Sequence, residues 1–286
     1  MTELFNITIY NYLMIFLRIG TVFMLTPGLS ASYVNIQVRL IFALAVSLVS
    51  MPLISPMLPH EPQEFSILTQ YILNEISIGI FLGMVMQFLF FSLNLAGSIA
   101  SQAIGFSNAQ IFDPTFQNQT MLIESFLSII SITVIFIMDI HHLMLEAIID
   151  SYYLFAPGKS IPWNDLTSHL SDTMSKSFAF GFKIGSPFIA FTIIFYTGIG
   201  LVSRLMPQLN IFFLSLPLQI YLGIGLLFIT APIMISVFLG YFDEGLYLFT
   251  HEKKDAEKWL PPKKMKRPKR KNLPNGRYPK QKKKVT

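Results

Sequence analysis

Long apolar runs separated by short polar breaks extend through most of the sequence. A helix that crosses a bilayer needs about 20 mostly apolar residues. Six regions meet or approach that length: residues 4–26, 33–54, 121–149, 178–203 and 211–239, and a region that begins near residue 67. We therefore predict an all-α integral membrane protein with about six hydrophobic helices.

Some of these regions do not have the pattern of a simple span. Residues 76–112 carry no charge, and this run is longer than one crossing requires. Two prolines, Pro217 and Pro232, interrupt the last region. The second half of region 121–149 contains several polar side chains: Asp139, His141, His142 and Glu146. Interruptions of this kind predict broken or re-entrant helices that are shielded by protein rather than by lipid.

The charge distribution divides the chain into two parts. Charged residues make up only 13% of the chain, against about 25% in soluble proteins. Residues 1–250 carry six basic and thirteen acidic side chains, a net charge of −7. Residues 251–286 carry fifteen basic and three acidic side chains, a net charge of +12. We predict a membrane domain over residues 1–250 and a disordered basic tail over residues 251–286 on the cytoplasmic side.

One sizeable polar loop is predicted between the apolar regions, over residues 156–177. Its Pro157, Gly158 and Pro162 favour turns, and it is too short to form a folded domain. Lys159 and Lys176 place the loop on the same side of the membrane as the tail.

Motifs for nucleotide binding and hydrolysis do not occur in the sequence. Gly158-Lys159-Ser160 looks like the end of a phosphate-binding loop, but Tyr153 stands where that loop requires its first glycine. The zinc-protease and serine-hydrolase motifs are also missing, and the chain has no cysteine for a thiolate metal site. We therefore predict no enzyme activity and no cofactor, so the energy for any transport has to come from another protein.

The histidine pair in region 121–149 allows two interpretations. His142 and Glu146 share a helix face and Asp139 is close in sequence, so these side chains form a candidate metal cluster. His141 and His142 are adjacent, however, and adjacent residues of a helix point about 100° apart, which suits a single metal ion poorly. The alternative is a polar helix end at the membrane surface, or a contact between subunits.

Charged side chains inside apolar regions have to face protein, water or a partner charge, because hydrocarbon solvates them poorly. Arg18 and Asp139 have apolar residues on both sides, so we predict that they are buried or lie at a contact between subunits. Glu75, Glu124 and Arg204 can instead stand at helix ends and reach the membrane surface.

Residues 94–120 form the most unusual stretch of the chain. The stretch carries no charge before Asp113, yet it is rich in Ser, Asn, Gln and Gly. Asp113-Pro114 then favours a turn or a break. Because irregular backbone cannot face lipid, this segment is predicted to line or plug a cavity. The alternative is an ordinary external loop.

A second polar break lies between two uncharged spans. Pro207, Gln208 and Asn210, which follow Arg204, predict a tight polar turn. The next apolar run, which ends at Pro217, then re-enters the membrane.

Small residues at a four-residue spacing indicate close contacts between helices. Two such pairs are Gly79 with Gly83 and Gly181 with Gly185.

These segments resemble the FliR family of flagellar type III export proteins. The resemblance covers residues 5–248, in matching order and spacing. Its motifs are Gln102-Ala-Ile-Gly-Phe-Ser-Asn-Ala-Gln-Ile-Phe-Asp-Pro114, Asp139-Ile-His-His-Leu-Met144, Asp150-Ser-Tyr152, Arg204-Leu-Met-Pro-Gln-Leu-Asn-Ile-Phe212, Leu216-Pro-Leu-Gln-Ile220 and Gly223. The injectisome SctT family shares the Asp-Pro and Pro-Gln-x-Asn motifs but generally lacks Asp-x-His-His, which favours the flagellar branch.

The resemblance implies a core subunit of an export gate that contains FliP-like and FliQ-like subunits and an FlhB-like export switch protein. The gate lies in the bacterial inner membrane, at the flagellar basal body, and unfolded flagellar subunits pass through its pore. The helices of the family are raised and inclined in the assembly, which accounts for the broken hydropathy. Residues 105–117 are implied to plug the pore, with these candidate residues: Gly105, Phe106, Ile111, Phe112, Asp113 and Pro114.

The basic tail is longer than the usual end of the family. We expect it to contact anionic membrane lipid or cytoplasmic export proteins, or to be a solvated extension, and we expect no specific nucleic-acid partner. Three other functions remain as alternatives: an injectisome export-gate subunit, a small-solute secondary transporter, and an intramembrane enzyme that uses Asp139 and His142. A transporter needs a symmetric pair of broken helices, and the sequence shows no internal repeat.

Overall fold

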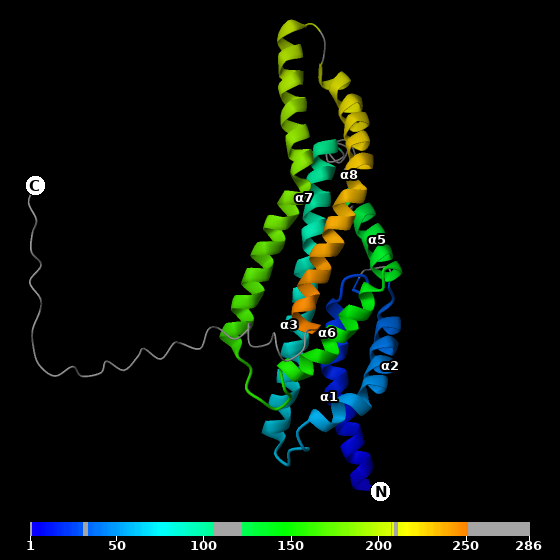
Figure 1. Cartoon of the computed structure of the whole chain (residues 1–286), viewed down its shortest axis with the longest axis vertical. Coiled ribbons are helices and arrows are strands. Elements are labelled where there is room, and N and C mark those ends of the chain that lie inside the picture. Colours follow the sequence, from blue (N-terminus) through cyan, green and yellow to red (C-terminus); the bar gives the residue numbers. More distant parts are fainter. Residues whose placement is uncertain (1, 31–33, 106–121, 207, 209–210, 251–286) are drawn as a thin grey trace, which may run out of the picture. The chain divides into compact units, whose positions relative to one another are not determined.

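The computed structural model describes residues 2–30, 34–105, 122–206, 208 and 211–250. These residues form seven α-helices and one short 3-10 helix, and no strand occurs among them (Figure 1). The bounds are α1 Thr2–Leu25, α2 Ile36–Ile54, η1 Ser55–Met57, α3 Phe65–Ile104, α5 Leu122–Ile137, α6 Ile140–Leu154, α7 Trp163–Leu205 and α8 Ile211–Thr250. The predicted all-α fold is confirmed.

Four stretches of the described chain are long and apolar enough to cross a membrane: Ile36–Met57, Phe65–Ile104, Trp163–Leu205 and Ser215–Tyr247. The pair α5 and α6 adds a fifth if it is taken as one broken span. The apolar part of α1, Ile9–Leu25, is shorter. The six apolar regions of the sequence therefore correspond to four or five spans by length and composition.

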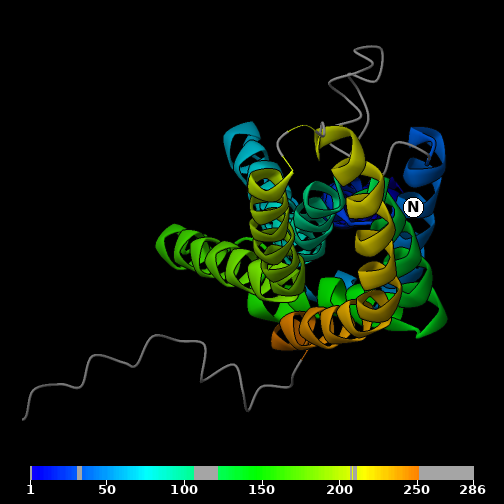
Figure 2. The same ribbon diagram turned by 90° about the horizontal axis from the view of Figure 1, so that it is seen from above.

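Four of the other described helices pack against α3. It contacts α1, α5, α7 and α8, and Figures 1 and 2 show α1 and α7 on different sides of it. A Cβ atom on Gly79 would lie 2.8 Å from the carbonyl oxygen of Arg18, and one on Gly83 would lie 2.6 Å from Leu25 Cβ. These two glycines therefore let α1 approach α3 closely and bring Arg18 against it.

A stripe of buried residues follows one face of α7, with spacings that are mostly three, four or seven positions. Its members are Leu166, Thr173, Ser177, Gly181, Ile184, Gly185 and Phe188. Gly181 and Gly185 meet Ser92 and Ile99 of α3. The prediction of a loop over residues 156–177 is wrong for residues 163–177, which belong to α7. That part has polar residues on its outer face, so its hydropathy is low although its inner face is buried.

Region 121–149 is not one helix, because α5 and α6 meet at a bend of 77°. At the bend Asp139 has φ 59° and ψ 14°, in the left-handed region that few residues other than glycine adopt. Aspartate tolerates this conformation because its short polar side chain can satisfy the local backbone. The bend directs α6 onto α8 and brings its carboxyl end to α1.

Two of the predicted segments lie outside the described residues. They are residues 106–117, which make up most of the predicted plug, and residues 251–286, the predicted tail. The disordered cytoplasmic tail stays a prediction.

Candidate functional site

The fold buries two opposite charges inside the packed helices. The exposed fraction of Arg18, in α1, is 0%, and that of Glu75, in α3, is 1%. A buried charge without a partner destabilises a protein by several kcal/mol. Both side chains therefore need counter-charges and hydrogen bonds inside the protein.

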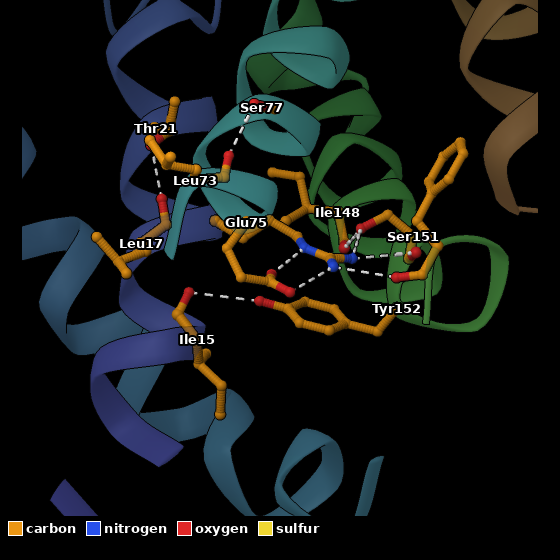
Figure 3. A network of polar contacts seen from close by, with 11 residues as sticks. Ile15, Leu17, Thr21, Leu73, Glu75, Ser77, Ile148, Ser151 and Tyr152 are labelled. Atoms are coloured by element: carbon orange, nitrogen blue, oxygen red, sulfur yellow. Dashed lines mark hydrogen bonds and ion pairs between the residues drawn. The ribbon is translucent and has the colours of Figure 1, made fainter. Parts of the chain in front are cut away.

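Arg18 and Glu75 form a bidentate ion pair. Arg18 Nε donates to Glu75 Oε2 at 2.6 Å, and Nη2 donates to Glu75 Oε1 at 3.0 Å. Parallel contacts of this kind are the strong form of an arginine–carboxylate interaction. Figure 3 shows Glu75, Ser151 and Tyr152 converging on one centre from α3 and α6.

The carboxyl end of α6 supplies the other acceptors for Arg18. Nη1 donates to the backbone oxygen of Ser151 at 3.2 Å and to its Oγ at 3.3 Å, and Nη2 donates to the Phe155 carbonyl at 3.0 Å. A guanidinium group has five N–H bonds, and the five contacts with Glu75, Ser151 and Phe155 use all of them. The guanidinium carbon also lies 3.9 Å from the centroid of the Tyr152 ring, in a cation–π contact.

We call this set the Arg18 network: Arg18, Glu75, Ser151, Tyr152 and Phe155. It joins α1, α3 and α6, and it places a positive charge at the carboxyl end of α6, where the helix dipole favours one. Both carboxylate oxygens and all guanidinium donors are engaged. The network is therefore suited to holding three helices together rather than to moving protons or binding a substrate.

A second polar contact holds the carboxyl end of α3, next to the predicted plug. The buried side chain of Gln219, in α8, donates from Nε2 to the Ala103 carbonyl at 2.8 Å. Gly105 then ends α3 in the left-handed conformation, with φ 91°. A Cβ atom on Gly105 would lie 3.1 Å from Gln219 Cδ, and one on Gly223 would lie 2.7 Å from Ile104 Cγ1. The last turn of α3 is therefore fixed against α8.

Gly105 is the one residue of the predicted plug set that the structure describes, at the end of α3. The rest of that set lies outside the described residues: Phe106, Ile111, Phe112, Asp113 and Pro114. Their role stays a prediction.

The predicted polar turn falls between α7 and α8. Arg204 is exposed in the last turn of α7, and Gln208 is exposed in the connection. Pro207 and Asn210 lie outside the described residues. Pro217 is within α8, two residues before the glutamine that contacts α3.

The polar residues near the start of α6 are not buried within this chain. Asp139, His142 and Glu146 are exposed, and His141 is half-buried. The imidazole centroids of His141 and His142 are 4.1 Å apart. Both residues lie within α6, so their positions on the helix still differ by about 100°, but their side chains turn toward each other and the rings do not diverge. One ligand atom from each of Asp139, His141 and His142 lies within 4.8 Å of the others, a cluster that does not include Glu146.

Sequence reasoning missed most partners of Arg18. The sequence allows Glu75 to be either a buried charge or a charge at a helix end. Ser151, Tyr152 and Gln219 stand in motifs that carry the resemblance, but no contact with α1 or α3 was predicted for them. The Arg18 contacts join residues 57 and 133 positions apart, and no local pattern encodes such pairings. The one signal that could have suggested the ion pair is that two apolar regions, residues 4–26 and the region that begins near residue 67, each contain a charge of opposite sign.

Comparisons with known proteins agree on one family. The family model described as "Bacterial export proteins, family 1" matches residues 9–245. The flagellar biosynthetic protein FliR of Caulobacter vibrioides is 31% identical over 242 residues, which cover 85% of this chain and 96% of that protein. FliR of Bacillus subtilis is 25% identical over 229 residues, 79% of this chain and 88% of that protein. FliR of Escherichia coli is 26% identical over 220 residues, which cover 76% of this chain and 83% of that protein.

Proposed function

We propose, since the chain belongs to family 1 of the bacterial export proteins, that it is a core membrane subunit of the flagellar type III protein export apparatus. The family and the FliR relatives make it an export component of flagellar biosynthesis. The proposal adds that it forms part of the gate through which unfolded flagellar subunits pass, that it plugs the resting pore, and that it performs no catalysis.

The family match over residues 9–245 is the observation that carries this proposal. It takes in all seven described α-helices, at least in part. The C. vibrioides relative is covered over 96% of its length, so the similarity is not limited to one shared membrane segment. The relatives compared are flagellar proteins by name, which favours the flagellar apparatus over the injectisome.

The exposed surface of α7 supports assembly with other subunits. Apolar side chains are exposed from Met174 to Leu205, a length of about 46 Å at 1.5 Å per residue. The hydrocarbon core of a bilayer is about 30 Å thick. Even a helix tilted by about 40°, the upper end of the usual range, keeps only about 39 Å within it. Part of this apolar surface therefore needs protein cover, which FliP-like and FliQ-like subunits and an FlhB-like protein provide in the proposed gate.

The contact between α3 and α8 supports a role for the following segment in the pore. Gln219 and Gly223 fix the end of α3 at Gly105, so the chain leaves α3 from a defined point. We propose that residues 105–117 plug the pore from that point, with Phe106, Ile111 and Phe112 as the apolar side chains that seal it.

Purification of the chain in mild detergent, through a carboxyl-terminal tag, tests membership of the gate. Mass spectrometry should identify FliP-like and FliQ-like subunits in one discrete assembly, and deletion of the gene should abolish motility and the export of flagellar subunits. Recovery of a stable monomer or homodimer without partners would contradict the proposal and favour a transporter or an enzyme.

Ion conductance of the assembled gate tests the plug separately. Replacing Phe106, Ile111 and Phe112 together by alanine should raise the ion leak in a planar bilayer, because the seal loses its large apolar side chains. The matched control replaces them by leucine, valine and leucine, which keeps the site apolar and should keep the leak low. An unchanged conductance in the alanine variant, with normal assembly, rules out this segment as the seal.

The proposed location is the bacterial inner membrane, with the basic tail in the cytoplasm and near anionic lipid. The chain contains no cysteine, so a single cysteine introduced at Lys283 reports the side of the tail. A membrane-impermeant maleimide should label that cysteine only after the cells are opened. Labelling of intact spheroplasts would place the tail outside.

A further inference from the structure

The start of α6 places polar groups on a surface that is otherwise apolar. Asp139 and His142 have exposed side-chain fractions of 76% and 70%. The two residues before them, Ile137 and Met138, are large apolar side chains that are also exposed. Both polar side chains are therefore open to a ligand from outside the chain.

The three polar side chains lie close enough to share one ion. His142 Nδ1 lies 3.6 Å from Asp139 Oδ1, and one ligand atom from each of Asp139, His141 and His142 lies within 4.8 Å of the others. The Nδ1 atom of His141 is buried and has no hydrogen-bond partner among the described residues. An unpaired buried nitrogen beside a carboxylate and a second imidazole is an incomplete set of contacts.

The kinds of ligand atom select a class of ion. Imidazole nitrogens suit zinc and its neighbours in the periodic table, whereas calcium and magnesium prefer oxygen ligands alone. Two donors on one tetrahedral zinc ion are roughly 3.3 Å apart, given bond lengths of about 2.0–2.1 Å. Because Asp139 and His142 are exposed, small rotations of their side chains can close the present separations to that value.

We propose that Asp139, His141 and His142 bind one divalent transition-metal ion of the zinc class. The ion takes three ligands from this turn and keeps a fourth position for water. It neutralises the Asp139 carboxylate, which lies at the bend between α5 and α6. The proposal rests on these three residues and does not depend on the export function.

Metal content of the full-length chain tests the proposal. The chain, with a tag that contains no histidine, is purified both alone and with its co-expressed partners, stripped with a chelator, loaded with Zn²⁺ and dialysed. Elemental mass spectrometry should find about one zinc ion per chain. His142→Ala and Asp139→Asn should each weaken zinc binding at least about tenfold in competition with a chelating dye, because even loss of an outer-shell partner costs about 10–100-fold.

Two controls separate this site from other zinc binding. His60→Gln removes an exposed histidine elsewhere, and Glu146→Gln removes an exposed carboxylate of α6 outside the cluster; both variants should keep the ion. Co²⁺ in the same site should show the visible absorption of tetrahedral cobalt and lose it in His142→Ala. Absence of bound zinc in both preparations, or zinc that survives His141→Ala with His142→Ala, would overturn the proposal. Unchanged circular dichroism of the variants excludes misfolding as the cause of a loss.

Discussion

The two ends of α6 carry charge in opposite surroundings. At the carboxyl end, Arg18 binds the last carbonyl groups inside the protein, together with its counter-ion Glu75. At the amino end, Asp139 is exposed beside two histidines, and its side chain makes no capping hydrogen bond within the described chain. Both charges have the sign that the helix dipole favours. Only at the carboxyl end, however, does a side chain of the described chain bind the terminal backbone groups of α6.

The difference indicates which contacts the chain completes by itself. The Arg18 network is complete once the described helices have packed, so its free energy belongs to the stability of this subunit. The cluster at Asp139 is completed by something else, which we propose is a metal ion. Substitutions at the carboxyl end of α6 should therefore lower the free energy of unfolding strongly, whereas substitutions at the amino end of α6 should change it only weakly.

The largest effect is expected from breaking the buried ion pair. Arg18→Met or Glu75→Met alone leaves one buried charge without a partner and should lower the free energy of unfolding by about 3–5 kcal/mol. The double variant removes both charges and should regain most of that loss, except about 1–3 kcal/mol for the carbonyl groups that lose their donor. Unfolding in mixed detergent micelles, followed by circular dichroism, measures the cycle. A double variant that shows only the sum of the two single losses would mean that the pair is not coupled.

A smaller effect is expected at the hydroxyl group of Ser151. Ser151→Ala removes one acceptor from a charged donor and should cost about 1.5–3 kcal/mol, towards the lower value because the contact is 3.3 Å long. Ser47→Ala is the matched control, because Ser47 is also buried but donates only to a carbonyl of its own helix. Equal losses in the same unfolding assay would show that the contact with Arg18 adds nothing.

The backbone at the bend should respond to the shape of residue 139 rather than to its charge. Asp139→Val puts a β-branched side chain at positive φ and should cost about 1–2 kcal/mol. Asp139→Gly suits the same φ and should change stability by less than about 1 kcal/mol, although it removes the carboxylate. A large loss in the glycine variant, measured by the same unfolding assay, would show that the carboxylate itself holds the bend.

The smallest effect is expected at the hydroxyl group of Tyr152. Its contact with the Ile15 carbonyl is 3.4 Å long, and the ring keeps its position over Arg18 in Tyr152→Phe. This variant should lose less than about 1 kcal/mol, whereas Tyr152→Leu also loses the cation–π contact and should lose more. Equal losses in the two variants would assign the effect to the hydroxyl group alone.

Local patterns predicted where the helices lie better than how they end. Apolar length located all of the described helices, because burial in lipid or protein requires it. The amino-terminal part of α7 was not predicted to be helical. Its mean hydropathy is low, because the polar outer face is averaged with the buried residues Leu166 and Thr173. The polar residues of region 121–149 predicted a broken helix, which the structure confirms, but not the position of the bend at Asp139, because neither glycine nor proline marks it.

The candidate site could be predicted only in part. The apolar residues around Arg18 indicated that it is buried or lies at a contact between subunits, and its place in the structure is the core of this chain. Its partners could not be predicted, because Glu75 and Ser151 meet it only through tertiary packing. The same holds for Gln219, which lies 116 residues from the carbonyl that it contacts.

The order of synthesis gives the Arg18 network a further consequence. Arg18 leaves the ribosome 57 residues before Glu75, which is roughly 3–11 s at the usual 5–20 residues per second. During that interval α1 holds a cation that costs about 2.5–3.5 kcal/mol to insert into a membrane alone. We expect this cost to fall once α3 is made, because Glu75 then pairs with Arg18 where Gly79 lets α1 and α3 approach closely. The contacts of Arg18 with Ser151 form only after α6 has been made.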